Sequence, residues 1–216
     1  FGGANLPCRI LQLLKLTLAR QLGGEELPDP AALIRAFDVD VFRAVDRDGV
    51  DAVYAALDGA YGQAEQILPT RFRDYEHSSR ADYYAVKNNF YFLFEIAERV
   101  KKAFYSHANI LRMAVSSLPL RETATECLLV DRWKLSCRED GRIQTLKDIP
   151  TAYVNSYELN LLLRADIYGI VRQFLEGPYE TDGLQDYSIL RLTGQSCRID
   201  IFREALKEFI PGKIIE

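Results

Sequence analysis

The chain has 216 residues and a mass of 24.6 kDa, and 48% of its residues are hydrophobic, enough for a substantial buried core. Its 27 basic and 31 acidic side chains give a net charge of -4 without long runs of one sign, which argues against a binder of duplex nucleic acid. No apolar run approaches the roughly 20 residues that span a bilayer, so we expect neither nucleic acid nor a membrane as partner.

The sequence contains four cysteines, and no two of them have the C-x-x-C spacing typical of a zinc site. They are Cys8, Cys127, Cys137 and Cys197. Widely separated thiols are typical of a reducing compartment, so we expect a cytoplasmic protein without structural zinc. The chain begins at Phe1 without an initiator methionine, which suggests a fragment of a longer protein.

The first predicted element is a buried helix between Pro7 and Gly23, because proline fits the first turn of a helix and glycine fits its end. Residues 25–70 are predicted to form a helical insertion. Its short helix-like segments are 31–37, 41–45 and 50–57. The acidic side chains of this insertion lack the glutamate spacing of a calcium loop, so we interpret them as a solvated face.

The longest predicted helix covers residues 79–106, where apolar side chains recur every three or four positions. Glu98, Lys101, Lys102 and Tyr105 share a neighbouring face because the last three follow Glu98 by three, four and seven positions. One interpretation is a salt-bridge ladder on a solvated face. The other is a grip on the hydroxyls and polar edge of a nucleoside. The spacing alone leaves both open.

Short strands are predicted over four segments, which are 109–116, 126–130, 134–137 and 143–146. The Asp-Gly pair at 140–141 predicts a tight hairpin between the last two. A second long helix is predicted over 156–175. Asn155 or Ser156 would cap this helix, and the Gly-Pro pair at 177–178 would end it.

The C-terminal segment predicts a buried strand over residues 187–192, a tight turn at Gly194 and a further helix. Ser196 can cap that helix, and the Pro-Gly pair at 211–212 would stop it. A buried strand that turns through glycine into a helix brings backbone close to whatever lies at the turn.

Arg198 would then lie in the first turn of this helix, where the positive end of the helix dipole disfavours a cation. A ligand with a flat, electron-rich group is one explanation, because a guanidinium stacks on such groups. The other explanation is a surface arginine paired with Asp200 or Glu204.

Three segments of the chain are residues 1–5, FGGAN; residues 98–102, ERVKK; and residues 192–199, LTGQSCRI. In this order they resemble three segments of the second lobe of the nucleotide-binding domain in DnaK-type heat-shock chaperones, which belong to the actin and sugar-kinase superfamily. The first segment is similar to the glycine pair that opens the outer subdomain of that lobe. The second resembles the family's adenosine-holding Glu-Arg-Ala-Lys-Arg segment, and the third resembles its Val-Gly-Gly-Ser-Ser-Arg-Ile-Pro loop.

The resemblance implies an α+β fold, the second lobe of an actin-like ATPase, with long helices packed on a small antiparallel sheet. It implies an outer subdomain over residues 1–186, with the helical insertion at about 25–70. Residues 187–216 would be a strand-loop-helix that belongs to the inner ATPase subdomain.

The resemblance also implies an adenosine clamp with two jaws, at residues 98–102 and 194–199. The first jaw would meet the ribose hydroxyls and one face of the base, and the second would bring backbone and an arginine to the other face. The implied nucleotide-binding residues are Gly3, Glu98, Lys101, Lys102, Gly194, Gln195, Ser196, Arg198 and Ile199. No catalytic or metal-binding residue is implied for this chain.

Two departures from the family pattern concern this clamp. Gln195 replaces the second glycine of the loop, and Lys102 replaces a stacking arginine, although lysine stacks less well. They leave open a non-enzymatic interaction lobe whose nucleotide site has decayed and whose insertion docks a partner. An actin-like or sugar-kinase-like ATPase lobe also stays open.

Phosphoryl transfer needs phosphate-binding glycine loops, carboxylates that hold magnesium and a group that positions water. In the superfamily these parts lie in the first lobe or before the opening glycines. We therefore expect this polypeptide to bind ATP or ADP weakly without hydrolysing it, with magnesium held through the missing lobe. The expected partners are the rest of the parent ATPase domain and a nucleotide-exchange or client protein.

Overall fold

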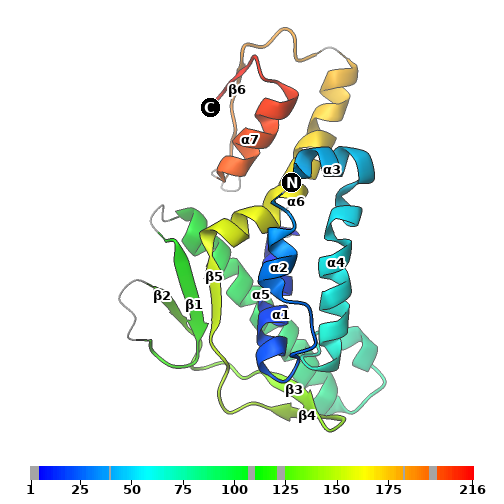
Figure 1. The fold of residues 1–216 in the computed structure, drawn as a ribbon, viewed down its shortest axis with the longest axis vertical. Helices are drawn as coiled ribbons and strands as arrows, with labels where there is room; N and C mark the ends of the chain where they lie inside the picture. Colours follow the sequence, from blue (N-terminus) through cyan, green and yellow to red (C-terminus); the bar gives the residue numbers. More distant parts are fainter. Residues whose placement is uncertain (1–4, 39, 107–109, 121–124, 182, 195–198) are drawn as a thin grey trace.

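The computed structural model describes residues 5–38, 40–106, 110–120, 125–181, 183–194 and 199–216 (Figure 1). Its helices are α1 (Asn5–Gln21), α2 (Pro30–Arg35), α3 (Val41–Asp48), α4 (Val50–Gln63), α5 (Arg80–Ser106), α6 (Ser156–Glu180) and α7 (Asp200–Phe209), with 3-10 turns η1 (Ala64–Gln66) and η2 (Phe72–Tyr75). Its strands are β1 (Arg112–Ser116), β2 (Glu126–Leu129), β3 (Ser136–Glu139), β4 (Arg142–Thr145), β5 (Ala152–Asn155), β6 (Ile189–Leu190) and β7 (Ile214–Ile215). The expected α+β class is confirmed.

The three-stranded sheet has the order β2-β1-β5. Its central strand β1 is antiparallel to β5, where Ala114 pairs with Tyr153, but parallel to β2, where Ala114 pairs with Cys127. The prediction of an antiparallel sheet is therefore wrong for β2. The chain leaves the end of β1 and returns to pair in the same direction, which no local sequence signal specifies.

The predicted hairpin is confirmed in β3 and β4, which pair in antiparallel register. Asp140 and Gly141 both have positive φ, at 48° and 78°. Two successive positive φ values are typical of the type I′ turn, whose twist matches that of the flanking strands. The Asp-Gly pair therefore fixes this connection locally.

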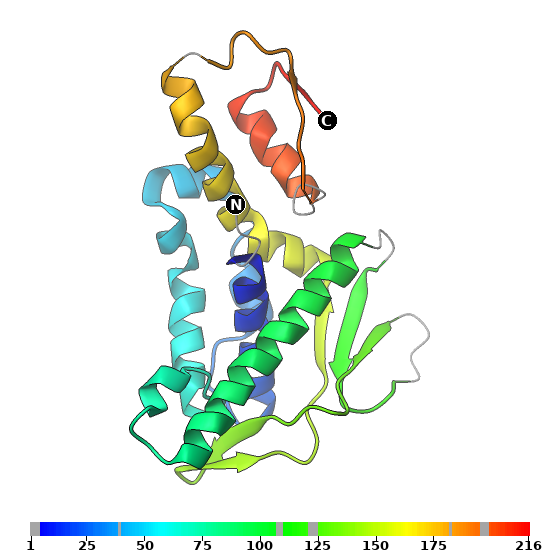
Figure 2. The same ribbon diagram turned by 180° about the vertical axis from the view of Figure 1, so that it is seen from behind.

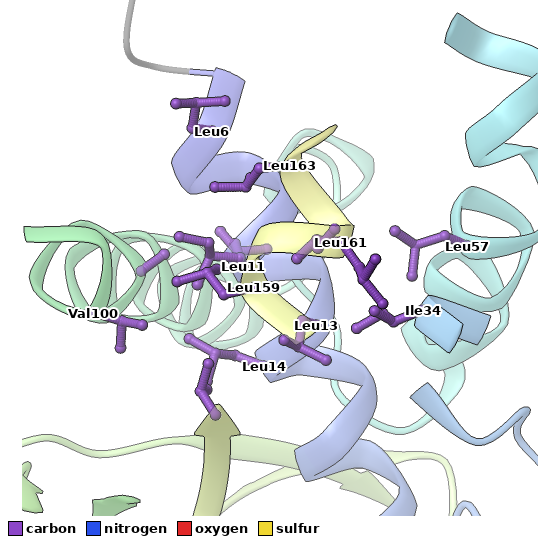
Figure 3. Packing of buried hydrophobic residues seen from close by; sticks show 14 of the residues in the cluster. Leu6, Leu11, Leu13, Leu14, Ile34, Leu57, Val100, Leu159, Leu161 and Leu163 are labelled. Carbon is purple, nitrogen blue, oxygen red and sulfur yellow. The ribbon is translucent and has the colours of Figure 1, made fainter. Parts of the chain in front are cut away.

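The core is centred on α1, which packs against α5 and α6 (Figure 3). Leu11, Leu13 and Leu14 of α1 are at most 3% exposed and belong to the same apolar cluster as Ile34 of α2 and Leu57 of α4. The insertion at residues 25–70 is helical, as predicted. Its helices pack on α1 and α6 and share the main core.

Helix α6 begins where it was predicted, since the Asn155 side-chain oxygen accepts a hydrogen bond from the backbone N–H of Glu158 at 2.8 Å. Its predicted end at Gly177 and Pro178 is wrong, because the helix continues to Glu180. Proline removes one backbone donor, yet the N–H of Thr181 still bonds the Gly177 carbonyl at 3.3 Å. The last turn is retained at the cost of one hydrogen bond.

In both ribbon views α6 changes direction along its length (Figures 1 and 2). Its first turns approach the C-terminal end of α5, and its later turns run beside α7. Figure 2 also shows the N-terminal end of α7 close to the place where α5 ends and α6 begins. Three helices that are separate in sequence therefore meet at one corner of the molecule.

The prediction of a buried strand over residues 187–192 is wrong. Only Ile189 and Leu190 form β6, and Ile189 is 53% exposed. β6 has β7 as its only partner among the described strands. α7 begins at Asp200 with Ile199 at its N-cap, later than a cap at Ser196 would place it, and ends at Phe209 as predicted. Within the described residues, no helix combines the length and apolarity needed to cross a membrane.

Candidate functional site

Helix α5 brings Glu98, Lys101 and Lys102 together on one face, as their spacing predicted. The Nζ of Lys101 lies 3.0 Å from Glu98 Oε1, and the Nζ of Lys102 lies 4.0 Å from Glu98 Oε2. The Lys101 side chain is 18% exposed and that of Glu98 is 26% exposed, whereas Lys102 is 68% exposed. One carboxylate therefore holds a half-buried cation and approaches an exposed one.

A second ion pair on α5, between Arg99 and Glu95, is exposed to solvent and serves as a comparison. Arg99 bonds Glu95 at 2.5 Å, four positions away, and both side chains are well exposed, at 45% and 38%. Glu98 and Lys101 are distinctly less exposed than this pair. The ion pairs of the ladder interpretation exist, and Glu98 and Lys101 are partly buried while Lys102 is exposed to solvent.

Of the segment 194–199, predicted as the second jaw, the structure describes Gly194 and Ile199, which precede α7. Gly194 has a φ of +106°, a region that favours glycine, so the predicted turn is confirmed at this position. Ile199 is 3% exposed, and its φ of -75° and ψ of 117° are those of an extended N-cap residue. Ile199, as the N-cap residue, makes no side-chain capping hydrogen bond. The backbone therefore turns at Gly194 and buries Ile199 before α7 begins.

A cavity of about 600 Å³ lies where α5, α6 and α7 meet. Its lining residues are Phe104, Tyr105, Ser106, Ile110, Leu111, Ser156, Leu159, Asn160, Arg164, Asp200, Ile201 and Glu204. This volume is within the range of small-molecule sites, which are mostly apolar with a few converging polar groups. The lining is more polar than that, because Ser106, Ser156, Asn160, Arg164, Asp200 and Glu204 make up half of it.

Two polar contacts organise the cavity wall. The Tyr105 hydroxyl donates to Asn160 Oδ1 at 3.0 Å, and Arg164 Nη2 lies 3.5 Å from Glu204 Oε2. Burial raises the pKa of Tyr105, so its hydroxyl remains a donor across the physiological range. The Nε of Arg164 is buried and has no hydrogen-bond partner among the described residues. Each contact joins α6 to one of the other two helices.

Several predicted site residues, which are Gly3, Gln195, Ser196 and Arg198, lie outside the described residues. Of the others, Glu98, Lys101 and Lys102 are brought together on α5, one to two turns before the cavity, and Gly194 and Ile199 lie before its α7 wall. Among the described residues, Glu204 pairs with Arg164.

Sequence reasoning missed Asn160 and Arg164 as site residues. In the sequence they are polar positions of a long helix whose apolar face lies elsewhere, and no local signal marks them. Tyr105 had a signal, because it shares the face of Lys101 one turn later. Only the meeting of α5 with α6 makes these three side chains neighbours.

The described residues contain no group of three or more histidine, cysteine, aspartate or glutamate side chains arranged to hold a metal ion. Cys8, Cys127 and Cys137 are free thiols. No family model matches the chain, and neither the curated proteins nor the solved structures contain a match. Function is therefore inferred from the residues and geometry of this chain alone.

Proposed function

We propose that this chain is the adenine-nucleotide-binding lobe of a DnaK-like molecular chaperone ATPase of the cytoplasm. The observation that carries the proposal is a cavity that the last turn of α5 and the first turns of α6 and α7 line together. The ends of α5 and α7 adjoin residues 98–102 and 192–199, the two segments that resemble the adenosine clamp. The cavity is thus lined by the helix ends that follow these two segments in the sequence, which supports a ligand shared between them.

The chemistry of the two jaws suits a nucleoside. Glu98 offers carboxylate oxygens to ribose hydroxyls, and Lys101 supplies donors to the same group. Lys102, the more exposed cation, is free to extend over a base. Hydrogen bonds to charged groups are stronger than neutral ones, so a few such contacts are sufficient for a weak, specific site.

The phosphate chemistry is assigned to the rest of the parent ATPase, with which this lobe would associate. ATP or ADP would be shared between the two lobes, with magnesium held by the other one. A nucleotide-exchange protein or a client is the further partner that such a switch requires. By itself this chain would bind adenine nucleotide without hydrolysing it.

A nucleotide titration with matched variants tests the proposal. Lys101→Met and Arg198→Ala remove one group from each jaw, and we expect each to weaken ADP binding about tenfold or more. Arg99→Met is the matched control, because Arg99 lies on the same helix but pairs with Glu95 in solvent. Isothermal titration or ligand-observed NMR with ATP and ADP would measure the affinities.

Unchanged affinity in both jaw variants would reject the clamp. A phosphate-release assay tests the claim that this chain binds nucleotide without hydrolysing it. Magnesium-dependent phosphate release by these 216 residues alone would contradict that claim.

A further inference from the structure

We propose that Asn160, oriented by Tyr105, reads the base of the bound nucleotide and selects a purine that carries an exocyclic amino group over one that carries a carbonyl. This inference rests on the proposed function, because it names the specificity-determining residue of the same site. It starts from the contact at 3.0 Å between the Tyr105 hydroxyl and Asn160 Oδ1, both of which line the cavity.

The position of this pair fits the base end of a nucleoside. Tyr105 follows Lys101 by one helical turn, about 6 Å along the axis of α5. A ribose held by Glu98 and Lys101 would therefore place its base at the level of Tyr105. At that level α5 faces the first turns of α6, and the cavity opens between them.

In the structure the Tyr105 hydroxyl donates to Asn160 Oδ1, and the amide nitrogen points elsewhere. Burial raises the pKa of Tyr105, so its hydroxyl can donate this bond at neutral pH. The carbonyl oxygen has two lone pairs and can accept a second hydrogen bond.

An amide fixed in this way presents one acceptor and one donor side by side. Adenine offers the matching pair, an amino donor beside a ring-nitrogen acceptor, which is why asparagine binds adenine in a bidentate manner. Hypoxanthine has a carbonyl oxygen in place of that amino group, and two acceptors would then face each other. The mismatch disfavours the carbonyl-bearing base.

The rest of the cavity wall favours the same choice. Asp200 and Glu204 of α7 also line it, and their carboxylates accept hydrogen bonds but donate none. Arg164 lies 3.5 Å from Glu204 and compensates part of this negative charge. Ile110 and Leu111 also line the cavity, and Leu111, which is 75% exposed, supplies apolar surface against which a flat ring can pack.

The experiment compares ATP with ITP, which differ only in the base, on the full 216-residue chain. Saturation-transfer NMR, which detects weak ligands, would measure both affinities. We expect ATP to bind the unmodified chain about three- to tenfold more tightly than ITP. Asn160→Leu removes both amide groups and should bring the two affinities within twofold of each other. Asn160→Asp keeps an acceptor for the amino group but loses the donor, so it should weaken both nucleotides and retain part of the preference.

Asn160 is exposed, so these substitutions leave the core untouched. Tyr105→Phe removes only the orienting hydroxyl and should reduce the preference, whereas Tyr157→Phe, an exposed tyrosine that bonds Asp38, should not. Equal binding of ATP and ITP by the unmodified chain would overturn the base reading and leave the proposed function standing. A preference that survives in Asn160→Leu would also overturn it. Absence of binding by either nucleotide would overturn both proposals.

Discussion

The hydroxyl of Tyr54 is inserted between two backbone groups of α6, the N–H of Asp166 and the carbonyl of Leu162. It accepts from the backbone N–H of Asp166 at 3.1 Å and donates to the carbonyl of Leu162 at 2.6 Å. In a regular α-helix those two backbone groups are bonded to each other. A side chain inserted in this way bends a helix, which accounts for the change of direction in α6 (Figure 1).

The bend has a consequence for the cavity. Asn160, before the bend, bonds Tyr105 of α5, and Tyr168, after it, stacks on Phe209 of α7. Tyr54 belongs to the insertion, is fully buried, and lies with its ring 3.6 Å from the guanidinium of Arg9. The insertion therefore helps to set the angle at which α7 meets the end of α5.

Tyr54→Phe should destabilise the protein by about 1–3 kcal/mol, because two buried backbone groups of α6 lose their shared partner. Urea unfolding would measure this change. Tyr157→Phe is the matched control, since its hydroxyl bonds Asp38 at the surface and its loss should cost less than about 0.5 kcal/mol. Identical unfolding midpoints for the two variants would show that the inserted hydroxyl does not stabilise α6.

Gly169→Ala should test how closely the insertion packs on α6. A Cβ at position 169 would lie 2.5 Å from Cγ2 of Val50, the first residue of α4. A valine side chain is stiff, so we expect a loss of about 1–3 kcal/mol. Thermal unfolding of Gly169→Ala, Val50→Ala and the double variant would form a cycle.

In that cycle, we expect Gly169→Ala to cost much less stability in the Val50→Ala background than in the natural chain. Val50→Ala removes the methyl group that the new Cβ would meet. Additive effects of the two substitutions would mean that α4 and α6 do not make this contact in solution.

Lys15 provides a prediction about pH. It is fully buried in α1, bonds Glu65 and Thr70, and lies 4.0 Å from the centre of the Tyr61 ring. Burial lowers the pKa of Lys15 from 10.5 to about 8. Burial alone would raise the pKa of Glu65, but the Lys15 ammonium and hydrogen bonds from Thr70 outweigh it and leave that pKa lowered.

Between pH 8 and 10.5 the unfolded chain would hold the Lys15 proton more tightly than the folded chain. Stability contributed by this group should therefore rise with pH across that window, by up to about 3 kcal/mol. Glu65 is ionised throughout it and adds no slope. Urea unfolding of the natural chain and of a Lys15→Met, Glu65→Gln double variant would measure this, since other groups titrate alike in both.

The double variant removes the pair together, which avoids leaving one buried charge without its partner. A difference in stability that stays flat from pH 8 to 10.5, or falls, would contradict the lowered pKa of Lys15.

Gly194→Ala and Gly59→Ala form a pair that separates backbone strain from packing. A Cβ at either position would meet nothing within 4 Å. Gly194 has a φ of +106°, so alanine there should cost about 1–2 kcal/mol. Gly59 lies inside α4, where alanine should add about 0.5–1 kcal/mol of stability. Chemical denaturation would check both, and equal effects would contradict the strained turn at Gly194.

Much of the fold could be predicted because its signals are local. The apolar repeat of residues 79–106 fixed a long helix, since only a 3.6-residue period places those side chains on one face. Asp140 and Gly141 fixed the hairpin, because they tolerate the positive φ that its turn requires. The Glu98, Lys101 and Lys102 group followed from helical spacing in the same way.

The failures share one cause, which is contact between residues far apart in the sequence. The parallel pairing of β2 and the exposure of β6 depend on neighbouring strands, which local periodicity does not reveal. The extension of α6 past Pro178 reflects retained bonding beyond it. The bend at Asp166 depends on a tyrosine more than a hundred positions away, whose hydroxyl competes with the helix for its own hydrogen bond.

The sequence by itself determined that Glu98, Lys101, Lys102 and Tyr105 lie on one side of α5, because side chains at helical spacing share a face whatever surrounds the helix. Only the tertiary structure decided that this face ends at a cavity. Asn160 meets Tyr105 across 55 positions of chain because the first turns of α6 approach the end of α5. Local spacing encodes what one helix presents, whereas packing between helices selects which groups from different elements can act on the same ligand.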